Sequence, residues 1–170
     1  SFNASHHTYY SAEVERDLPA EMLAELRPLE AALIAQAPTR ASVNLWLGNA
    51  PVVAPCHYDG YHNAYAQLHG VKRFVLAPPT AWHLLRAHPF LHPSHAQCDR
   101  PLDTSPSLAV TGTADAADKE DSVAQLAAAG AMVVELKRGD VLYLPPMWYH
   151  ETTVLAAGGE ANDEDSGGEG

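Results

Sequence analysis

Apolar and polar side chains alternate over several short stretches of the chain, and glycine or proline closes most of these stretches. The segment ASVNLWLGN (41–49) is rich in β-branched and aromatic residues, which predicts a strand. The segment VVAPCHYD (52–59) predicts a second strand, and residues 131–155 return to strand character with a turn at 138–140. Short strands separated by turn residues are typical of a β-rich fold.

The segment NAYAQLHGVKRFVLAPP (63–79) predicts a hairpin. One strand is expected to end near His69, and the chain is expected to turn at Gly70 before VKRFVLA returns beside it. The next segment, TAWHLLRAH (80–88), follows two prolines and predicts a short helix. Residues 88–107 are rich in proline, histidine and serine, so we expect a long ordered loop there.

Near the N-terminus, an apolar stripe with helical spacing predicts a helix over residues 18–38. Pro28 is expected to divide this helix, because proline lacks an N–H and its ring clashes with the preceding turn. An Ala/Asp-rich insertion is predicted at about 108–129, with its last part, SVAQLAAAG, in a helix. The stripe consists of Leu23, Leu26, Leu29, Leu33 and Ile34.

These elements predict a mostly β fold, namely a small antiparallel barrel or sandwich of jelly-roll type with an N-terminal helix and short peripheral helices. We expect an N-terminal helical segment (1–40) that packs on the barrel, the barrel itself (41–155), and an acidic, glycine-rich tail (156–170) of disordered composition. Barrels of this type have a mouth where residues from distant strands meet.

The charge and the cysteine content narrow the class of protein. The formal net charge is -11, which disfavours a nucleic-acid backbone as the main partner, because phosphate binding needs a basic surface. Cys56 and Cys98 are too few for a disulfide framework and favour an intracellular protein, cytoplasmic or nuclear. No stretch is long and apolar enough for a membrane span, and both ends are expected to be cuts from a longer polypeptide. The oligomeric state is not predicted.

The stretch CHYDGYHNAYAQLHGVKRF (56–74) contains the candidate functional residues. It places several polar groups, which are costly to bury, among apolar strand-forming residues. Residues i and i+2 of a strand share a face, so His57 and Asp59 project together. One imidazole and one carboxylate are two thirds of the 2-His-1-carboxylate set that binds non-haem Fe(II). The best candidate for the third ligand is His150, which follows GDVLYLPPMWY at the end of a predicted strand.

Lys72 is predicted to be half-buried, since Val71, Phe74 and Leu76 surround it in the sequence. A lysine there either extends its ammonium to solvent or pairs with an anion. Beside a metal, that anion could be the far carboxylate of a dicarboxylate cosubstrate.

Two blocks of sequence, HYDGYHNAYAQLHGVKRFVLAPP and GDVLYLPPMWYH, resemble the JmjC and cupin-like 2-oxoglutarate oxygenases. The likeness extends from about Asn44 to His150 and is greatest to the hydroxylase branch related to the asparaginyl hydroxylase that acts on hypoxia-inducible factor. It implies a double-stranded β-helix that holds Fe(II), binds 2-oxoglutarate as cosubstrate, and uses molecular oxygen to hydroxylate a protein side chain.

The resemblance also implies roles for individual residues. His57, Asp59 and His150 match the catalytic metal ligands. The residues that match or fit the family's cosubstrate site are Lys72, Asn63, Asn44 and Tyr10.

Two departures from the family pattern bear on activity. Ala54 stands where relatives often have a threonine or serine that binds the cosubstrate, and the lost hydrogen bond is worth about 1 kcal/mol. After His150 the chain passes quickly into an acidic, glycine-rich tail, so a strand that usually closes the sheet is expected to be missing, which would leave an exposed edge.

Other assignments stay open. The chain could be a metal-binding cupin-type enzyme that does not use 2-oxoglutarate, or a non-catalytic barrel, and demethylation is a less favoured variant of the oxygenase hypothesis. His62 and His69 are expected at the rim or on the surface. A second metal site at His88, His92 and His95 is disfavoured, because the prolines between them indicate a loop.

Overall fold

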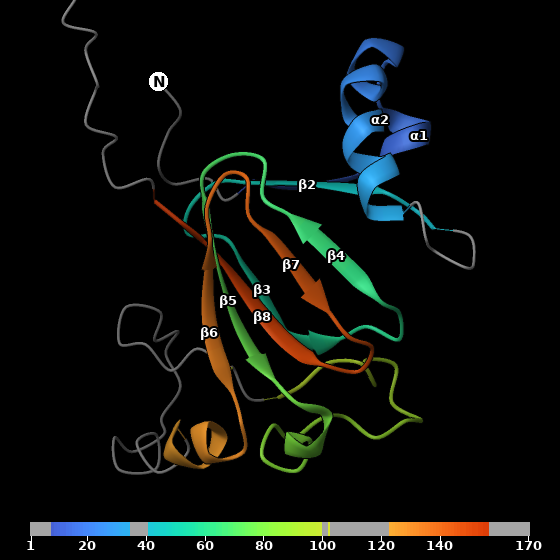
Figure 1. The fold of residues 1–170 in the computed structure, drawn as a ribbon. Helices are drawn as coiled ribbons and strands as arrows, with labels where there is room; N and C mark the ends of the chain where they lie inside the picture. The colour runs from blue at the N-terminus through green and yellow to red at the C-terminus, as the bar shows by residue number, and fades with distance from the viewer. Residues whose placement is uncertain (1–7, 35–40, 100–101, 103–122, 157–170) are drawn as a thin grey trace, which may run out of the picture.

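Eight strands in three antiparallel sheets form the body of the computed structural model, which describes residues 8–34, 41–99, 102 and 123–156 (Figure 1). The largest sheet has the order β3-β8-β5-β6. Its strands are β3 (Val53–Tyr58), β5 (Val71–Ala77), β6 (Met132–Leu136) and β8 (Tyr149–Leu155). The mostly β, jelly-roll class predicted from the sequence is confirmed.

Both faces of this sheet are covered, which is why its central strands β5 and β8 are mostly buried. The inner face carries Phe74 and Leu76, and it packs against a second layer made of β4 (Asn63–Ala66) and β7 (Val141–Leu144) (Figure 1). The inner core contains Phe74, Leu76, Leu136 and Leu144, with Tyr65, Val134, Leu142 and Trp148 packed against it.

The outer face of the large sheet is covered by segments from the loops. Its core contains Cys56, Val75, Ala77, Ala81, Leu85, Leu102, Leu126 and Tyr149. Leu126 belongs to a short helix at 123–128, in the part of the insertion where a helix was predicted. The segment 95–99 runs beside β3, and Cys98 donates its backbone N–H to the Cys56 carbonyl over 3.0 Å. The outer face is thus an apolar layer, and the polar groups predicted for the site lie on the inner face.

The predicted hairpin at 63–79 is wrong. β4 pairs with β7, and β5 pairs with β6 and β8, so the chain changes layers between Ala66 and Val71. Gly70 takes a positive φ of 70° in this crossing, a conformation that glycine adopts without strain. The crossing places the ring of Tyr65 against that of Phe74, with centroids 5.0 Å apart, so that both bury apolar area between the layers.

A one-residue irregularity interrupts the pairing of β3 with β8. Ala54 pairs with Thr152 and His57 pairs with His150, so Pro55 and Cys56 both lie opposite the single residue Glu151. This two-against-one arrangement is a β-bulge, a position that tolerates proline because a ladder hydrogen bond is already lost there.

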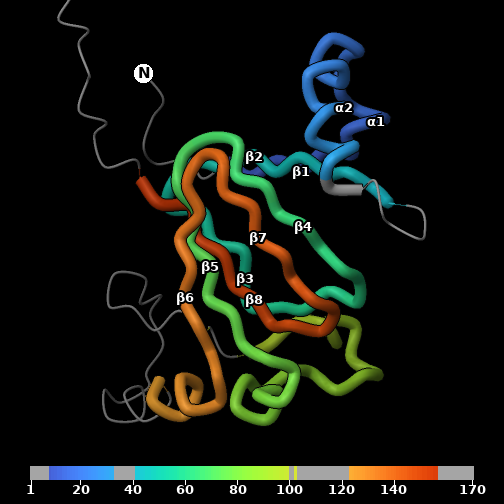
Figure 2. The backbone as a smooth tube through the Cα atoms, in the orientation of Figure 1, coloured from blue at the N-terminus to red at the C-terminus, as the bar shows by residue number. Residues whose placement is uncertain are grey.

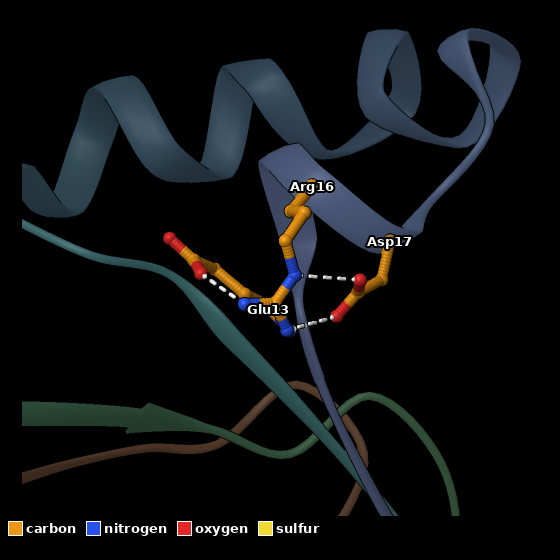
Figure 3. A network of polar contacts seen from close by, with 3 residues as sticks. All are labelled: Glu13, Arg16 and Asp17. Atoms are coloured by element: carbon orange, nitrogen blue, oxygen red, sulfur yellow. Dashed lines mark hydrogen bonds and ion pairs between the residues drawn. The ribbon is translucent and has the colours of Figure 1, made fainter.

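The N-terminal part contains a strand that the sequence did not reveal. β1 (Tyr9–Glu13) pairs with β2 (Asn44–Gly48) in a two-stranded ribbon, and α1 (Val14–Asp17) and α2 (Ala20–Ile34) follow β1 (Figure 2). At the start of α1, Arg16 binds both oxygens of Asp17 and reaches Glu13 at 3.1 Å (Figure 3). These charges are exposed, so they contribute little to stability.

Two predicted helices differ from the observed ones. α2 runs through Pro28 without a break. Proline lacks only its own N–H, so one helical hydrogen bond is lost at Pro28 while the residues on both sides stay helical. The segment 80–88 forms only a 3-10 turn, Pro79–Ala81, followed by further turns. Its hydrogen bonds join residues three apart, and Arg86 takes a positive φ of 53°, which ends any helix.

The strand predicted around His150 extends to Leu155 and is a central strand of the large sheet. The proposed acidic tail and most of the Ala/Asp-rich insertion lie outside the described residues, so the domain boundaries at 1–40, 41–155 and 156–170 stay predictions. Among the described helices, none is long and apolar enough to cross a membrane.

Candidate metal centre

Three potential metal ligands meet at one end of the inner face. His57 and His150 lie directly opposite each other on neighbouring strands, and their ring centroids are 4.2 Å apart. Asp59 follows β3, two residues after His57, and its Oδ2 is 3.7 Å from His150 Nε2. One donor atom from each of these residues lies within 4.8 Å of the other two. In the described part of the chain, no other group of histidine, cysteine and acidic residues has this geometry.

The backbone fixes how both imidazoles present their nitrogens. The Nδ1 atom of His57 is 2.7 Å from the Pro55 carbonyl, and that of His150 is 3.1 Å from the Trp148 carbonyl. A carbonyl oxygen only accepts, so each Nδ1 carries the proton and each Nε2 keeps a lone pair. Such bonds commonly orient histidine ligands. The donor set of two Nε2 atoms and one carboxylate therefore fits an iron(II) ion.

One bond to the side chain of Asp59 and one to its backbone fix this residue in place. Asn63, the first residue of β4, donates its Nδ2–H to Asp59 Oδ2 over 2.7 Å. Met147, in the turn before β8, donates its backbone N–H to the Asp59 carbonyl over 2.8 Å. These two bonds connect Asp59 to β4 and to the strand that carries His150, so the position of the acid is set by both layers.

Burial favours the neutral form of His150. This side chain is buried, and burial followed by repulsion from His57 lowers its pKa. A neutral imidazole is the form that binds a metal. Repulsion from Lys72 makes a smaller contribution to the lowered pKa of His150.

Lys72 is more deeply buried than the sequence predicted, with only 6% of its surface exposed. It lies on β5, four residues before Leu76, which pairs with His150, so it shares the inner face with the ligands. Its Nζ atom is 3.1 Å from the hydroxyl oxygen of Tyr65. The ammonium also lies 5.0 Å from the centroid of the Tyr65 ring and 5.9 Å from that of Phe74.

This environment makes the stability of the protein depend on pH through Lys72. Burial lowers the pKa of the ammonium from its ordinary value of 10.5, whereas the pKa of the neighbouring Tyr65 is raised by burial to about 12. Between the lowered pKa and 10.5, the unfolded chain binds more protons than the folded one, so the free energy of unfolding rises with pH. Below that window the full cost of burying the charge is present.

We therefore expect Lys72→Met to be more stable than the wild type at pH 7, and we expect the difference to shrink as pH rises toward 10. Urea unfolding at a series of pH values measures this difference. Lys137→Met, which removes an exposed lysine, is the control and should show no such trend. A difference that stays constant with pH would contradict a buried, charged Lys72.

Two further residues predicted to bind the cosubstrate, Asn44 and Tyr10, lie on the ribbon formed by β1 and β2. Asn44 is exposed at the start of β2. Tyr10 is half exposed on β1. Its neighbour Tyr9 stacks on Trp46 and makes a small contribution to the raised pKa of Tyr65. The roles of Asn44, Asn63 and Tyr10 toward a cosubstrate stay predictions.

The other histidines discussed from the sequence lie outside the centre in the described part of the chain. His62 contacts the hydroxyl of Tyr143 at the surface, and His69 is exposed, as expected from the sequence. His88 stacks on His92 and pairs with Asp99, but these groups do not form a triad with metal-site spacing.

Sequence reasoning missed Tyr65, because β4 was assigned to a hairpin with β5. A signal was present, since Tyr65 follows Asn63 by two residues and must share its face of the strand.

The sequence is similar to JmjC proteins of several organisms. The chain is 34% identical over 114 residues to Jumonji C domain-containing protein 5 of Drosophila melanogaster, covering 66% of this chain and 25% of that protein. It is 27% identical over 132 residues to the lysine-specific demethylase JMJ32 of Arabidopsis thaliana, covering 69% of this chain and 38% of the relative.

The human bifunctional peptidase and (3S)-lysyl hydroxylase JMJD7 is 27% identical over 119 residues, covering 64% of this chain and 36% of the relative. The chain thus spans well under half the length of each of these relatives. Their names support the JmjC assignment but do not single out the asparaginyl hydroxylase branch. The cupin-like domain family matches residues 2–162, which is nearly the whole sequence, and the chain belongs to that family.

Proposed function

We propose that this chain is an Fe(II)- and 2-oxoglutarate-dependent oxygenase that hydroxylates a protein side chain. The observation that carries the proposal is the donor set of His57, Asp59 and His150 at one end of the sheet face that also carries a buried ammonium, Lys72. Burying a charge is costly unless an anion meets it. A metal-binding barrel that does not bind a carboxylate cosubstrate therefore has no evident need for such a lysine.

In the proposed reaction, 2-oxoglutarate, dioxygen and a substrate C–H bond give succinate, carbon dioxide and the hydroxylated substrate. Iron, when bound, supplies the redox chemistry. His57 and His150 would hold the ion through Nε2, and Asp59 would hold it through its carboxylate. Asn63 holds that carboxylate by one oxygen, and Lys72 binds the distal carboxylate of the cosubstrate with a charge-assisted hydrogen bond.

The substrate class rests on the relatives. The name of one of them describes a lysyl hydroxylase and the names of others describe lysine-specific demethylases. We favour hydroxylation, as in the asparaginyl hydroxylase branch suggested by the sequence. A cupin-type enzyme that binds a metal without 2-oxoglutarate is the alternative, and the absence of a carboxylate partner for Lys72 among the described residues argues against it.

Turnover of 2-oxoglutarate tests the proposal. The purified chain is incubated in air with 2-oxoglutarate, with and without Fe(II), in the presence of pooled peptides that contain asparagine, lysine or methylated lysine. We expect iron-dependent succinate, together with peptides that gain one oxygen atom by mass spectrometry. Loss of a methyl group from methylated peptides would instead indicate demethylation. Metal binding without any 2-oxoglutarate binding would indicate the alternative cupin-type enzyme.

A further inference from the structure

The ammonium of Lys72 has an incomplete set of partners. It has three N–H donors, and within the described residues its hydrogen-bond acceptor is the Tyr65 hydroxyl, at 3.1 Å. The faces of Tyr65 and Phe74 lie beside it but accept only weakly. No carboxylate of the described part of the chain pairs with this buried charge. The remaining donors are therefore available to a ligand.

Tyr65 adds a second hydrogen-bond donor beside the Lys72 ammonium. Its oxygen accepts a hydrogen bond from Lys72, so its own O–H proton must point to another acceptor. Burial raises the pKa of Tyr65 to about 12, so the phenol keeps that proton near neutral pH. An ammonium and a protonated hydroxyl, 3.1 Å apart, form a pair of donors that suits the two oxygens of a carboxylate.

The position of Tyr65 connects this donor pair to the metal ligands. Asn63 and Tyr65 are two residues apart on β4, so they share one face of that strand. Asn63 contacts Asp59, and Tyr65 contacts Lys72. One short strand therefore lies against both ends of the proposed site, which suits a ligand with an anionic group at each end.

From these contacts we propose that the Tyr65 hydroxyl binds the distal carboxylate of the dicarboxylate cosubstrate together with Lys72. Tyr65 is then a binding residue that favours 2-oxo acids with a second carboxylate over those without one. This inference rests on the proposed function, because it assigns a partner to the same cosubstrate.

The test is Tyr65→Phe, which removes the hydroxyl and keeps the ring that packs on Phe74. Calorimetry with Zn(II) in place of iron measures the affinity for 2-oxoglutarate and for 2-oxobutyrate, which lacks the second carboxylate. We expect about tenfold weaker binding of 2-oxoglutarate, as for the loss of one hydrogen bond to a charged group, and unchanged binding of 2-oxobutyrate. The matched control is Tyr143→Phe, whose hydroxyl contacts His62 at the surface.

The outcomes separate this inference from the proposed function. If the wild type does not bind 2-oxoglutarate, both are wrong. If Lys72→Ala weakens binding but Tyr65→Phe does not, only the role of Tyr65 is wrong. Equal weakening of both 2-oxo acids by Tyr65→Phe would show that the hydroxyl only supports the structure, and this would also overturn the inference. In a Lys72→Ala background, we expect the effect of Tyr65→Phe to be smaller than in the wild type.

Discussion

Replacing Asp59 with alanine is expected to lower iron-dependent 2-oxoglutarate turnover by more than about 100-fold, because the loss of groups that merely orient a metal ligand already costs about 10–100-fold. Asp59 is the anionic member of the donor set, and His57 and His150 alone would bind the ion more weakly and leave its charge unbalanced. Succinate formation and the affinity for Zn(II) should both fall, while the far-ultraviolet circular dichroism spectrum stays that of the wild type.

Asp99→Ala is a matched control for this variant. Asp99 also faces a histidine, with its Oδ1 3.2 Å from His88 Nε2, but it lies outside the metal centre. It should leave both turnover and Zn(II) affinity close to wild type. Wild-type turnover in Asp59→Ala would show that the carboxylate does not bind the metal, and the triad would then need another explanation.

Replacing Lys72 with alanine is expected to weaken 2-oxoglutarate binding by about 2–5 kcal/mol, much of it the cost of leaving the distal carboxylate buried and unpaired. Metal affinity should change far less, because Lys72 contacts Tyr65 rather than any of the three ligands. Lys72→Arg should restore binding only in part, since a planar guanidinium needs more room than an ammonium between Tyr65 and Phe74.

Calorimetry with 2-oxoglutarate and Zn(II) compares the wild type with both variants. Lys137→Ala, at an exposed position, is the control. Equal affinities for the wild type and Lys72→Ala would remove the cosubstrate from the proposal and leave a metal-binding domain. Together, Asp59→Ala and Lys72→Ala separate the metal from the cosubstrate, because only the first should weaken Zn(II) binding.

The sequence predicted the parts of the site that follow from local geometry. His57 and Asp59 could be placed together because alternate residues of a strand share a face, and the structure brings them together. His150 lies far along the chain, and its assignment depended on the resemblance of its flanking residues to a known family. The structure gives the physical reason for its position, which is direct pairing of β8 with β3.

The parts that could not be predicted depend on which strands pair. Turn residues at 67–70 are equally compatible with a hairpin and with a crossing between layers, and only burial of both Tyr65 and Phe74 between the sheets favours the crossing. β1 was missed because Tyr9–Glu13 is mostly exposed and has little apolar alternation. The partnership of Tyr65 with Lys72 depends on that crossing, so it was missed as well.

The bulge in β3 has a consequence for the kind of metal that the site prefers. Before the bulge, Ala54 lies opposite Thr152, and the same register continued without it would bring Cys56 opposite His150. His57 would then point to the outer face, and a thiolate would stand where an imidazole now stands. Thiolates are soft ligands that favour zinc or copper(I), whereas imidazole with carboxylate suits iron(II). The extra residue at the bulge thus places an imidazole opposite His150 in place of a thiolate, and so favours iron(II) over zinc or copper(I).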